Sequence, residues 1–345
     1  MELPKGLGGR LLLLVAACGA ALAAGEILVR ATGAAPQVAY LHKGQFRLSS
    51  NVLIGWEPIP NPDSKGSTLH PQWSEEQRNS LGYRDYEHTL QKVPGVYRIE
   101  VIGDSVTKGL GTQEHEGTFP SVIERKLRES GTPNEVLNFG VEGYNTQQEV
   151  ETLRDRGLRY DPDLVILAYL PNDRDWPAHH LYVELLQEER GSGSIDRTRL
   201  SPLLGRSALY RFLRFRVLGP LFLSTAESDT EIQRLVNLVQ TDTVEKYFGV
   251  LAQLQKKAGF QVLVVVFPYL DNLAHYSHAA DHAWVRALSA RYGFHHLDLL
   301  DAFARCEEKS DKPIAIDNVH PNFIGNYCAG VTIAEYIRSE ILPQR

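Results

Sequence analysis

Residues 98–109 read RIEVIGDSVTKG, a short apolar run that ends at a glycine and leads into a serine. Residues 99–102 predict a buried strand, and Gly103-Asp104-Ser105 predicts a tight turn at its carboxyl end. Open α/β sheets build their sites at this end of their strands. Ser105 is therefore a candidate nucleophile, although Gly, Asp and Ser are also ordinary turn residues.

Beyond this turn the hydrophobic pattern alternates between strand and helix periodicity. It predicts strands at 135–139, 164–169, 262–267 and 295–299, and helices at 119–127, 147–158, 243–258, 282–292 and 323–341. Near-continuous apolar strands separated by helices indicate a parallel sheet that is covered on both faces. We predict a three-layer α/β/α sandwich of about five parallel strands.

Composition limits the class of protein. The 345 residues, 43% hydrophobic and 23% charged, describe a globular chain of one large domain or two small ones. A net charge of −6 argues against a nucleic-acid partner. Three cysteines are too few for a disulfide scaffold and lack the spacing of a zinc site. In an exported protein Cys306 and Cys328 could pair; two buried free thiols are the alternative.

The N-terminal segment predicts export. Residues 11–29 read LLLLVAACGAALAAGEILV, and Lys5 and Arg10 precede them. At about 1.5 Å per residue this run nearly crosses a hydrocarbon core of about 30 Å, with the N-terminus in the cytoplasm. We expect a retained anchor. A signal peptide cleaved near residues 21–23, a lipoprotein modified at Cys18 and a buried helix of a cytoplasmic protein are the alternatives.

Three regions are predicted: a membrane anchor or signal segment at 1–30, a lead-in region at 31–96 and a catalytic domain at 97–345. The lead-in is rich in Pro, Gly and polar residues and is expected to add a few short strands. An insertion at about 181–229 interrupts the alternation. Its residues 197–216 hold six arginines and no acid. They suit either a lid or membrane-surface helix, or a helix packed on the sheet with a solvated basic face.

Four short stretches follow predicted strands or precede the last helix. They are Gly103-Asp104-Ser105, residues 138–146 with Gly143, Pro171-Asn172-Asp173, and residues 317–322 with Asp317 and His320. In a parallel sheet all four would meet at one rim.

Their chemistry is that of a serine nucleophile. The hydroxyl of Ser105 needs a base, which the imidazole of His320 can supply. That ring needs an acceptor on its other nitrogen, and Asp317 lies three residues earlier on a turn. The backbone N–H groups of Ser105 and Gly143 and the side-chain amide of Asn172 are candidate donors to an oxyanion.

The four stretches, in this order, resemble the sequence blocks of the SGNH, or GDSL, hydrolase superfamily, and in particular its exported or membrane-anchored bacterial esterases. The resemblance covers about residues 79–341 and implies a flavodoxin-like sandwich and a metal-free serine hydrolase. It implies Ser105 as the nucleophile, Asp317 and His320 as its triad partners, and Ser105, Gly143 and Asn172 as the oxyanion hole. The third block departs from the family pattern, because Leu170 stands where glycine is usual.

Other polar residues are given ordinary roles. His179-His180 and the series His275, His278 and His282 could suggest a metal site, but no carboxylate or thiol motif accompanies them, so packing or solvated roles are expected. Asp104 and Asp173 are expected to cap a helix or brace a loop. No phosphate-binding glycine motif is present. We predict no cofactor and no metal.

The leading hypothesis is a serine esterase of the cell envelope, tethered by its N-terminal helix with the catalytic domain in the periplasm or at the cell surface. Its substrate would be an acyl ester or an acylated carbohydrate. An O-acetyltransferase or deacetylase of envelope polysaccharides would use the same residues. A non-catalytic binding protein of the same fold is the third hypothesis.

Overall fold

The computed structural model describes residues 7–32, 45–60, 78–174, 179–189, 207–213, 230–239 and 242–342. The chain forms two compact units, and each is described here by itself. The first comprises Met1–His42 and Gln187–Gln233, and the second comprises Lys43–Leu186 and Arg234–Arg345.

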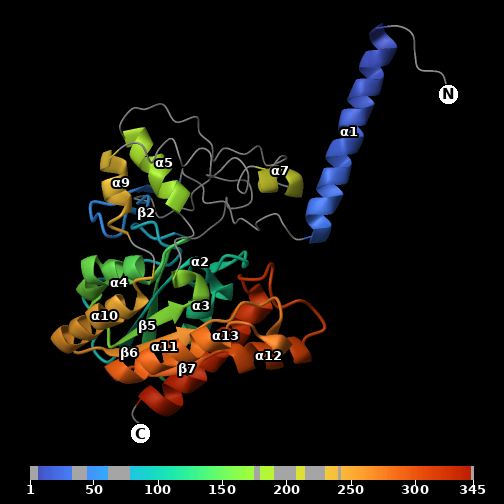
Figure 1. The fold of residues 1–345 in the computed structure, drawn as a ribbon. Helices are drawn as coiled ribbons and strands as arrows, with labels where there is room; N and C mark the ends of the chain where they lie inside the picture. Colours follow the sequence, from blue (N-terminus) through green and yellow to red (C-terminus); the bar gives the residue numbers. More distant parts are fainter. Residues whose placement is uncertain are drawn as a thin grey trace. The chain divides into compact units, whose positions relative to one another are not determined.

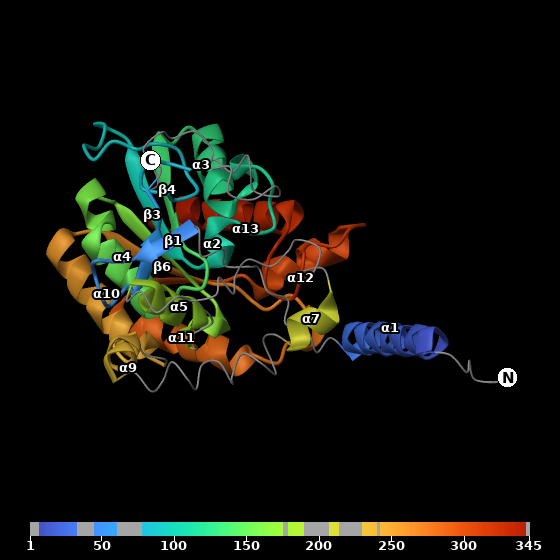
Figure 2. The same ribbon diagram turned by 90° about the horizontal axis from the view of Figure 1, so that it is seen from above.

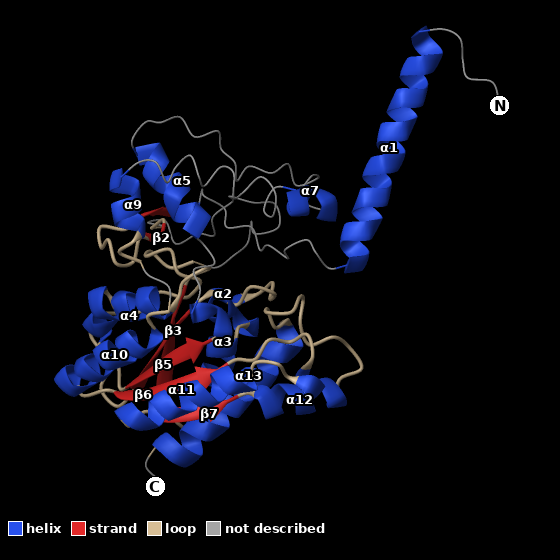
Figure 3. Cartoon of the chain, viewed as in Figure 1, coloured by secondary structure: helices blue, strands red, loops and turns tan. Residues whose placement is uncertain are grey.

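The second unit is built on a parallel sheet of five strands in the order β4-β3-β5-β6-β7 (Figures 1 and 3). The strands are β3 (Tyr97–Gly103), β4 (Asn134–Gly140), β5 (Leu164–Tyr169), β6 (Gln261–Val266) and β7 (His295–Asp298). Gly103 is level with Gly140 on one side and with Ala168 on the other. The loops after β3, β4 and β5 therefore leave the sheet at one rim.

Helices cover both faces of the sheet (Figure 2). One layer contains α3 (Phe119–Glu129), α12 (Leu300–Lys309) and α13 (Phe323–Tyr336), in which α13 packs on both other helices. The other contains α4 (Thr146–Asp155), α10 (Val244–Ala258) and α11 (Ala279–Tyr292). The predicted three-layer sandwich is confirmed.

Side-chain caps mark where α4 and α13 begin. Asn145 starts α4 with a capping box, in which its side chain and that of Gln148 each accept from the other's backbone N–H. Asn322 starts α13 and accepts from the N–H groups of Ile324 and Gly325. These caps fix the entry of the chain into the helices that flank the rim.

The layer of α3, α12 and α13 encloses the main apolar core. All six residues of β5 are buried, and Ile166 packs in one cluster with Ile123 of α3 and Ile333 of α13. Cys306 of α12 is joined to Cys328 of α13 by a disulfide, with the two Cα atoms 6.3 Å apart. Of the two alternatives for these cysteines, the structure has the paired form.

The lead-in region contains a two-stranded antiparallel sheet, formed by β1 (Phe46–Leu48) and β2 (Trp56–Pro58). The Tyr144 hydroxyl, at the rim, donates to the carbonyl of Trp56 (2.5 Å), and their rings meet edge to face. Arg84 is buried and donates to the carbonyls of Gly109 and Thr112. The lead-in therefore supports the loops after β3 and β4, although its residues 61–77 lie outside the described ranges.

The first unit contains α1 (Leu7–Thr32) and the short helix α7 (Ala208–Phe212). The carboxylate of Glu26 accepts from the Ser207 hydroxyl (2.7 Å) and from the N–H groups of Ala208 (2.9 Å) and Leu209 (2.8 Å). Val29 packs against Ala208 and has Leu209 and Phe212 beside it. The sequence did not predict this pairing of α7 with α1. Most of the Arg-rich stretch at 197–216 lies outside the described residues, as do the side chains of residues 179 and 180.

Some elements differ from the sequence prediction. A helix begins at Ser105 itself, as α2 (Ser105–Lys108), whereas the first helix that we predicted after β3 starts at residue 119. The helix α12 was not predicted. The last predicted helix, at 323–341, is α13 followed by a π-helical turn at Ile337–Ile341. The remaining α-helices of the described residues are α5 (His179–Glu189) and α9 (Thr230–Val236), and short 3₁₀ turns lie at His115–Gly117, Gly157–Tyr160, Pro171–Arg174 and Leu273–His275.

Candidate active site

Ser105 is held at the junction of β3 and α2. Gly103 ends the strand, and Asp104 caps the helix by accepting from the Val106 N–H (2.9 Å). Ser105 is the first residue of α2, so the helix does not use its backbone N–H. Ser105 is buried, with 8% of its surface exposed. The turn thus presents a hydroxyl and an available N–H at the rim of the sheet.

The short helix α2 lies unusually close to β4. The Asn138 side chain donates to the carbonyl of Thr107 (2.9 Å) and accepts from the Gly140 N–H (2.9 Å). A Cβ at Gly140 would overlap the backbone nitrogen of Lys108. Glycine at this position is therefore required for the close approach that fixes the orientation of Ser105.

His320 and Asp317 lie on the loop before α13. Ser105 Oγ is 2.8 Å from His320 Nε2, and His320 Nδ1 is 2.7 Å from Asp317 Oδ2. Asp317 Oδ1 accepts from the N–H groups of Val319 (2.8 Å) and His320 (2.7 Å). One carboxylate therefore fixes the loop with one oxygen and the imidazole with the other.

The electrostatics suit a base that is paired with an acid. Burial alone lowers the pKa of His320, but the hydrogen bond and charge of Asp317, with the charges of Asp104 and Glu142, bring this pKa above its usual value. Burial raises the pKa of Asp317, but its hydrogen bonds to His320 outweigh burial and lower it. Asp317 is thus ionised and favours the protonated ring that would form during attack.

Further bonds hold the loop that carries His320. The Ile316 N–H donates to the His320 carbonyl (3.0 Å), and the Asn322 N–H donates to that of Ile314 (2.9 Å). From outside the loop, the Leu270 N–H donates to the Asn318 carbonyl (2.7 Å). The disulfide between Cys306 and Cys328 spans this part of the chain.

The two other predicted site residues are at the same rim. Asn172 lies in a 3₁₀ turn after β5 (Pro171–Arg174), and its Nδ2 donates to Asp104 Oδ2 (3.3 Å). A side-chain amide carries two N–H groups, so one remains to donate elsewhere. Gly143 follows β4 with φ 74°, in the left-handed region. Among the described residues, no hydrogen bond joins Gly143 to Ser105 or His320. The structure thus brings Ser105, His320 and Asp317 into contact and links Asn172 to them through Asp104.

The departure of the third block has a structural explanation. Leu170, which stands where glycine is usual, is fully buried in the core beneath the rim. Its carbonyl accepts from the Asp173 N–H (3.0 Å), which closes the turn that contains Asn172. The larger residue is therefore accommodated without moving Asn172 away from Asp104.

Three buried carboxyl groups lie behind the site. Asp104, Glu149 and Asp173 are buried, and Asp173 Oδ2 accepts from the Thr146 hydroxyl (3.0 Å). Burial, followed by the negative charge of Asp104, raises the pKa of Asp173; burial and the charges of Asp173 and Asp104 do the same for Glu149. Burial also raises the pKa of Asp104. The neutral forms of Glu149 and Asp173 are favoured, so little negative charge accumulates where an oxyanion would form.

Sequence reasoning missed two supporting contacts. Asp104 was expected only to cap or brace, yet it also accepts from Asn172. Lys108 Nζ, on α2, is 2.7 Å from Glu142 Oε1, and both side chains are buried. This ion pair joins the helix that begins with Ser105 to the loop that contains Gly143. The only signal in the sequence was an ionisable residue near each predicted site residue.

In the described part of the chain, no group of three or more His, Cys, Asp or Glu side chains could hold a metal ion. His282, one of the histidines considered as a ligand, contacts Asp298 and Tyr276 instead.

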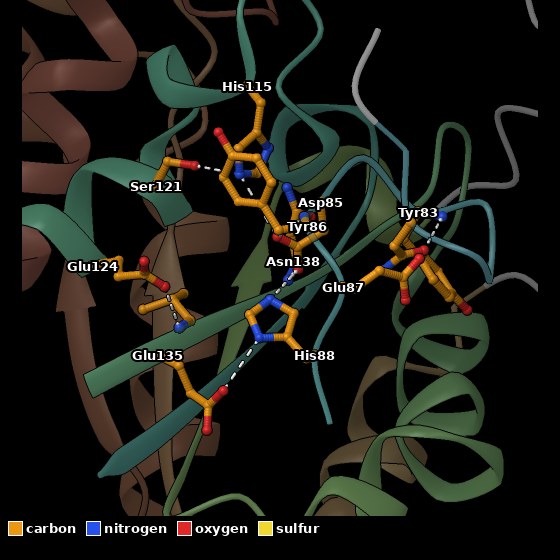
Figure 4. Close-up of polar contacts among 12 residues, drawn as sticks. Tyr83, Asp85, Tyr86, Glu87, His88, His115, Ser121, Glu124, Glu135 and Asn138 are labelled. Carbon is orange, nitrogen blue, oxygen red and sulfur yellow. Dashed lines mark hydrogen bonds and ion pairs between the residues drawn. The ribbon is translucent and has the colours of Figure 1, made fainter. Parts of the chain in front are cut away.

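A second group of Ser, His and Asp lies between the lead-in region and α3 (Figure 4). Ser121 Oγ is 2.9 Å from His115 Nε2, and the same nitrogen is 3.6 Å from Asp85 Oδ1. Asp85 also accepts from the N–H groups of Tyr86 and Asn138 (2.8 Å each). Because serine and carboxylate meet one ring nitrogen, this group cannot pass a proton as the Ser105 group could.

Comparison with known families gives the assignment. The model of the GDSL-like Lipase/Acylhydrolase family matches residues 101–326, which is more than half of the chain. The chain belongs to this family. It is therefore an SGNH/GDSL-type hydrolase, and the resemblance noted in its sequence is confirmed. No curated protein matches the sequence.

Several solved structures are similar to this chain at low sequence identity. An acetyl xylan esterase, AlAXEase, is 18% identical over 71% of this chain and 100% of its own, with a TM-score of 0.41. The lipase/acylhydrolase from Enterococcus faecalis is 15% identical over 72% and 100%, with a TM-score of 0.42. TesA is 14% identical over 69% and 97%, also with a TM-score of 0.42. The family assignment rests on the family match.

Proposed function

We propose that this GDSL-family hydrolase is a serine esterase in which Ser105 is the nucleophile, His320 the general base and Asp317 the residue that orients the base. The observation that supports this most directly is the pair of contacts on opposite nitrogens of His320. Its Nε2 lies 2.8 Å from Ser105 Oγ, and its Nδ1 lies 2.7 Å from Asp317 Oδ2.

The steps follow from this arrangement. Ser105 Oγ attacks the acyl carbon while His320 Nε2 takes its proton, and the charge of Asp317 stabilises the imidazolium. The N–H groups of Ser105 and Gly143 and the free N–H of Asn172 donate to the oxyanion. His320 then protonates the leaving oxygen, and the acyl-enzyme remains. Water, deprotonated by the same ring, attacks the acyl carbon; the bond from that carbon to Ser105 Oγ breaks, His320 returns the proton to Oγ, and the acid is released.

The substrate we propose is an acyl ester or an acylated envelope carbohydrate. The same residues would support transfer of the acyl group to a sugar hydroxyl or deacetylation of an envelope polysaccharide, because only the acceptor or leaving group differs. Product analysis with and without a sugar acceptor separates them. We expect hydrolysis products in both; a rise in acylated sugar with acceptor would instead indicate an acyltransferase.

We further propose that α1 anchors the protein and places the catalytic domain outside the cytoplasm. Residues Leu13–Thr32 of α1 are long and apolar enough to cross a membrane, with a mean hydropathy of 1.8, although a signal sequence would pass the same test. The disulfide between Cys306 and Cys328 supports export, because such bonds persist in oxidising compartments. Full-length protein expressed in bacteria should remain in the membrane after carbonate extraction and be degraded by protease added outside the inner membrane. Release into the soluble fraction would contradict the anchor.

The nucleophile can be tested by labelling. The full-length protein is treated with a fluorophosphonate probe, which bonds to activated serines. We expect a single labelled site, Ser105, no labelling of Ser105→Ala, and normal labelling of Ser121→Ala. Equal labelling of Ser105→Ala and the unsubstituted protein would contradict the proposed mechanism.

A further inference from the structure

His282 is part of a chain of hydrogen bonds, called the relay below, that the proposed mechanism does not use. His282, on α11, is almost fully buried. Its Nδ1 lies 3.0 Å from Asp298 Oδ2, and its Nε2 lies 2.8 Å from the Tyr276 hydroxyl. Asp298 ends β7, and Tyr276 lies in the segment between β6 and α11. Three elements that follow one another in the fold are therefore joined by one side chain.

With a neutral imidazole ring, only one assignment of donors and acceptors satisfies both hydrogen bonds of His282. A carboxylate only accepts, so His282 Nδ1 carries the proton and Nε2 accepts from the Tyr276 hydroxyl. The Tyr276 oxygen in turn accepts from the Tyr269 N–H (3.2 Å). The rings of Tyr276 and His282 also meet edge to face, with centroids 4.8 Å apart. The relay thus fixes the backbone at Tyr269.

The next residue along the chain touches the loop that carries the proposed base. The Leu270 N–H donates to the Asn318 carbonyl (2.7 Å), and Asn318 lies between Asp317 and His320. Leu270 also packs against the apolar core. Two adjacent residues therefore link the relay to the loop: the Tyr269 N–H donates to Tyr276, and the Leu270 N–H donates to the loop of His320.

We propose that Tyr276 is a positioning residue, which acts together with His282 and Asp298. It holds the loop of Asp317 and His320 in the position that brings His320 Nε2 into contact with Ser105 Oγ. The proposal rests on the proposed function of His320. The loop's own bonds, from Asp317 Oδ1 and from Ile316 to His320, fix its internal shape but do not attach it to the sheet. The Leu270–Asn318 bond attaches the loop to the segment that follows β6, and the relay sets where Leu270 lies in that segment.

The test removes the Tyr276 hydroxyl and keeps its ring. Tyr276→Phe should lower kcat on an activated acyl ester by about tenfold and leave KM within about twofold, because small displacements of a catalytic group affect the chemical step more than binding. Asp298→Asn should have a smaller effect of the same kind; its Oδ1 can still accept from the Leu300 N–H, so α12 keeps its start. The control is Tyr292→Phe, at the far end of α11, which should change neither constant.

A cycle with His320→Ala separates positioning from a general structural role. If Tyr276 acts through His320, then Tyr276→Phe should not reduce further the residual activity of His320→Ala. An equal tenfold loss in both backgrounds, or an unchanged kcat in Tyr276→Phe alone, would overturn the proposal. Full activity of His320→Ala would instead refute the proposed function. Thermal unfolding of each variant shows whether the fold is retained.

Discussion

The chain contains two groups of Ser, His and Asp, and they differ in how the ring is used. In the first group His320 contacts Ser105 through Nε2 and Asp317 through Nδ1. In the second, Ser121 and Asp85 both approach Nε2 of His115 (Figure 4). A carboxylate can orient a base and stabilise its charge only from the nitrogen that does not take the proton. Proximity of the three residue types is therefore not sufficient.

The electrostatics of the two groups also differ. Burial lowers the pKa of His115, and the charge of Asp85 does not restore it. For His320, a hydrogen bond and the charge of Asp317 outweigh burial and raise the pKa. Asp85 uses its oxygens to accept backbone N–H groups of the lead-in and of β4. The second group joins elements of the fold, whereas the first presents a base to a nucleophile.

The largest expected difference between the groups lies in their serines. Ser105→Ala should reduce kcat on an activated acyl ester by about 10⁴-fold or more, because the nucleophile is lost. Ser121→Ala, which removes an equally short contact to a histidine, should change kcat by less than about twofold, since this serine has no part in the mechanism. The measurement is steady-state turnover of full-length protein. A comparable loss of kcat in both variants would mean that it does not matter for catalysis which ring nitrogen the aspartate contacts.

The aspartates should differ nearly as much. Asp317→Asn should lower kcat by about 10³-fold to 10⁴-fold, because an amide can donate to Nδ1 and impose the wrong tautomer. Asp85→Asn should leave kcat within about threefold but lower the free energy of unfolding by about 1–3 kcal/mol, since the amide has one uncharged acceptor oxygen for two backbone N–H groups and its NH₂ faces the other.

Parallel kinetics and denaturant titrations of the two variants check this. A kcat defect in Asp85→Asn at unchanged stability would contradict a purely structural role for that residue.

The sheet could be predicted because its strands are buried apolar runs with sharp ends. The strand at 164–169 was predicted without error, and the others were correct to within a few residues. The helix α12 was missed because its N-cap, Leu299, gives no capping signal, whereas α4, of the same length, begins at a capping Asn145. The helix α2 is a single turn, too short to show a period.

Some residues of the candidate site could also be predicted from the sequence, whereas others could not. Ser105, Asp317 and His320 could be proposed from sequence because turn residues at strand ends meet at one rim. The contacts of Asp104 with Asn172 and of Lys108 with Glu142 depend on how closely the loops approach, which no local pattern reports. Glu26 and Ser207 are 181 residues apart, and the sequence around neither residue predicts its contact with the other.

Asn172 sharpens the comparison because its side-chain amide lies beside the first group and can donate to an oxyanion there. Asn172→Ala should lower kcat by about 10²-fold to 10³-fold and leave KM nearly unchanged, as expected for a donor to the oxyanion. Because Asn172 also donates to Asp104, a change in the position of Ser105 is the competing explanation. Fluorophosphonate labelling of a purified Asn172→Asp variant checks the size of the effect: aspartate keeps the shape but, when ionised, offers no N–H to the oxyanion or to Asp104, so it should label as slowly as Asn172→Ala. Labelling at the normal rate would exclude a donor role.

The smallest effect we predict concerns pH, and the two histidines should act with opposite sign. His320 has a raised pKa, so its contribution to stability is present below the ordinary histidine value of about 6.5 and is lost as pH rises through the folded pKa. His115 has a lowered pKa, so its neutral form contributes above that value, and stability is lost as pH falls below it.

These signs can be measured as differences between variants. Relative to His115→Gln, the unsubstituted protein should lose stability as pH falls from about 7 to 5; relative to His320→Gln, it should lose stability as pH rises from about 6 to 8. The acid limb of kcat/KM should lie above pH 6.5 or so, because only neutral His320 accepts the proton, and should not move in His115→Gln. A shift of that limb in His115→Gln would mean that the two groups are coupled, which their separate partners, Asp85 and Asp317, argue against.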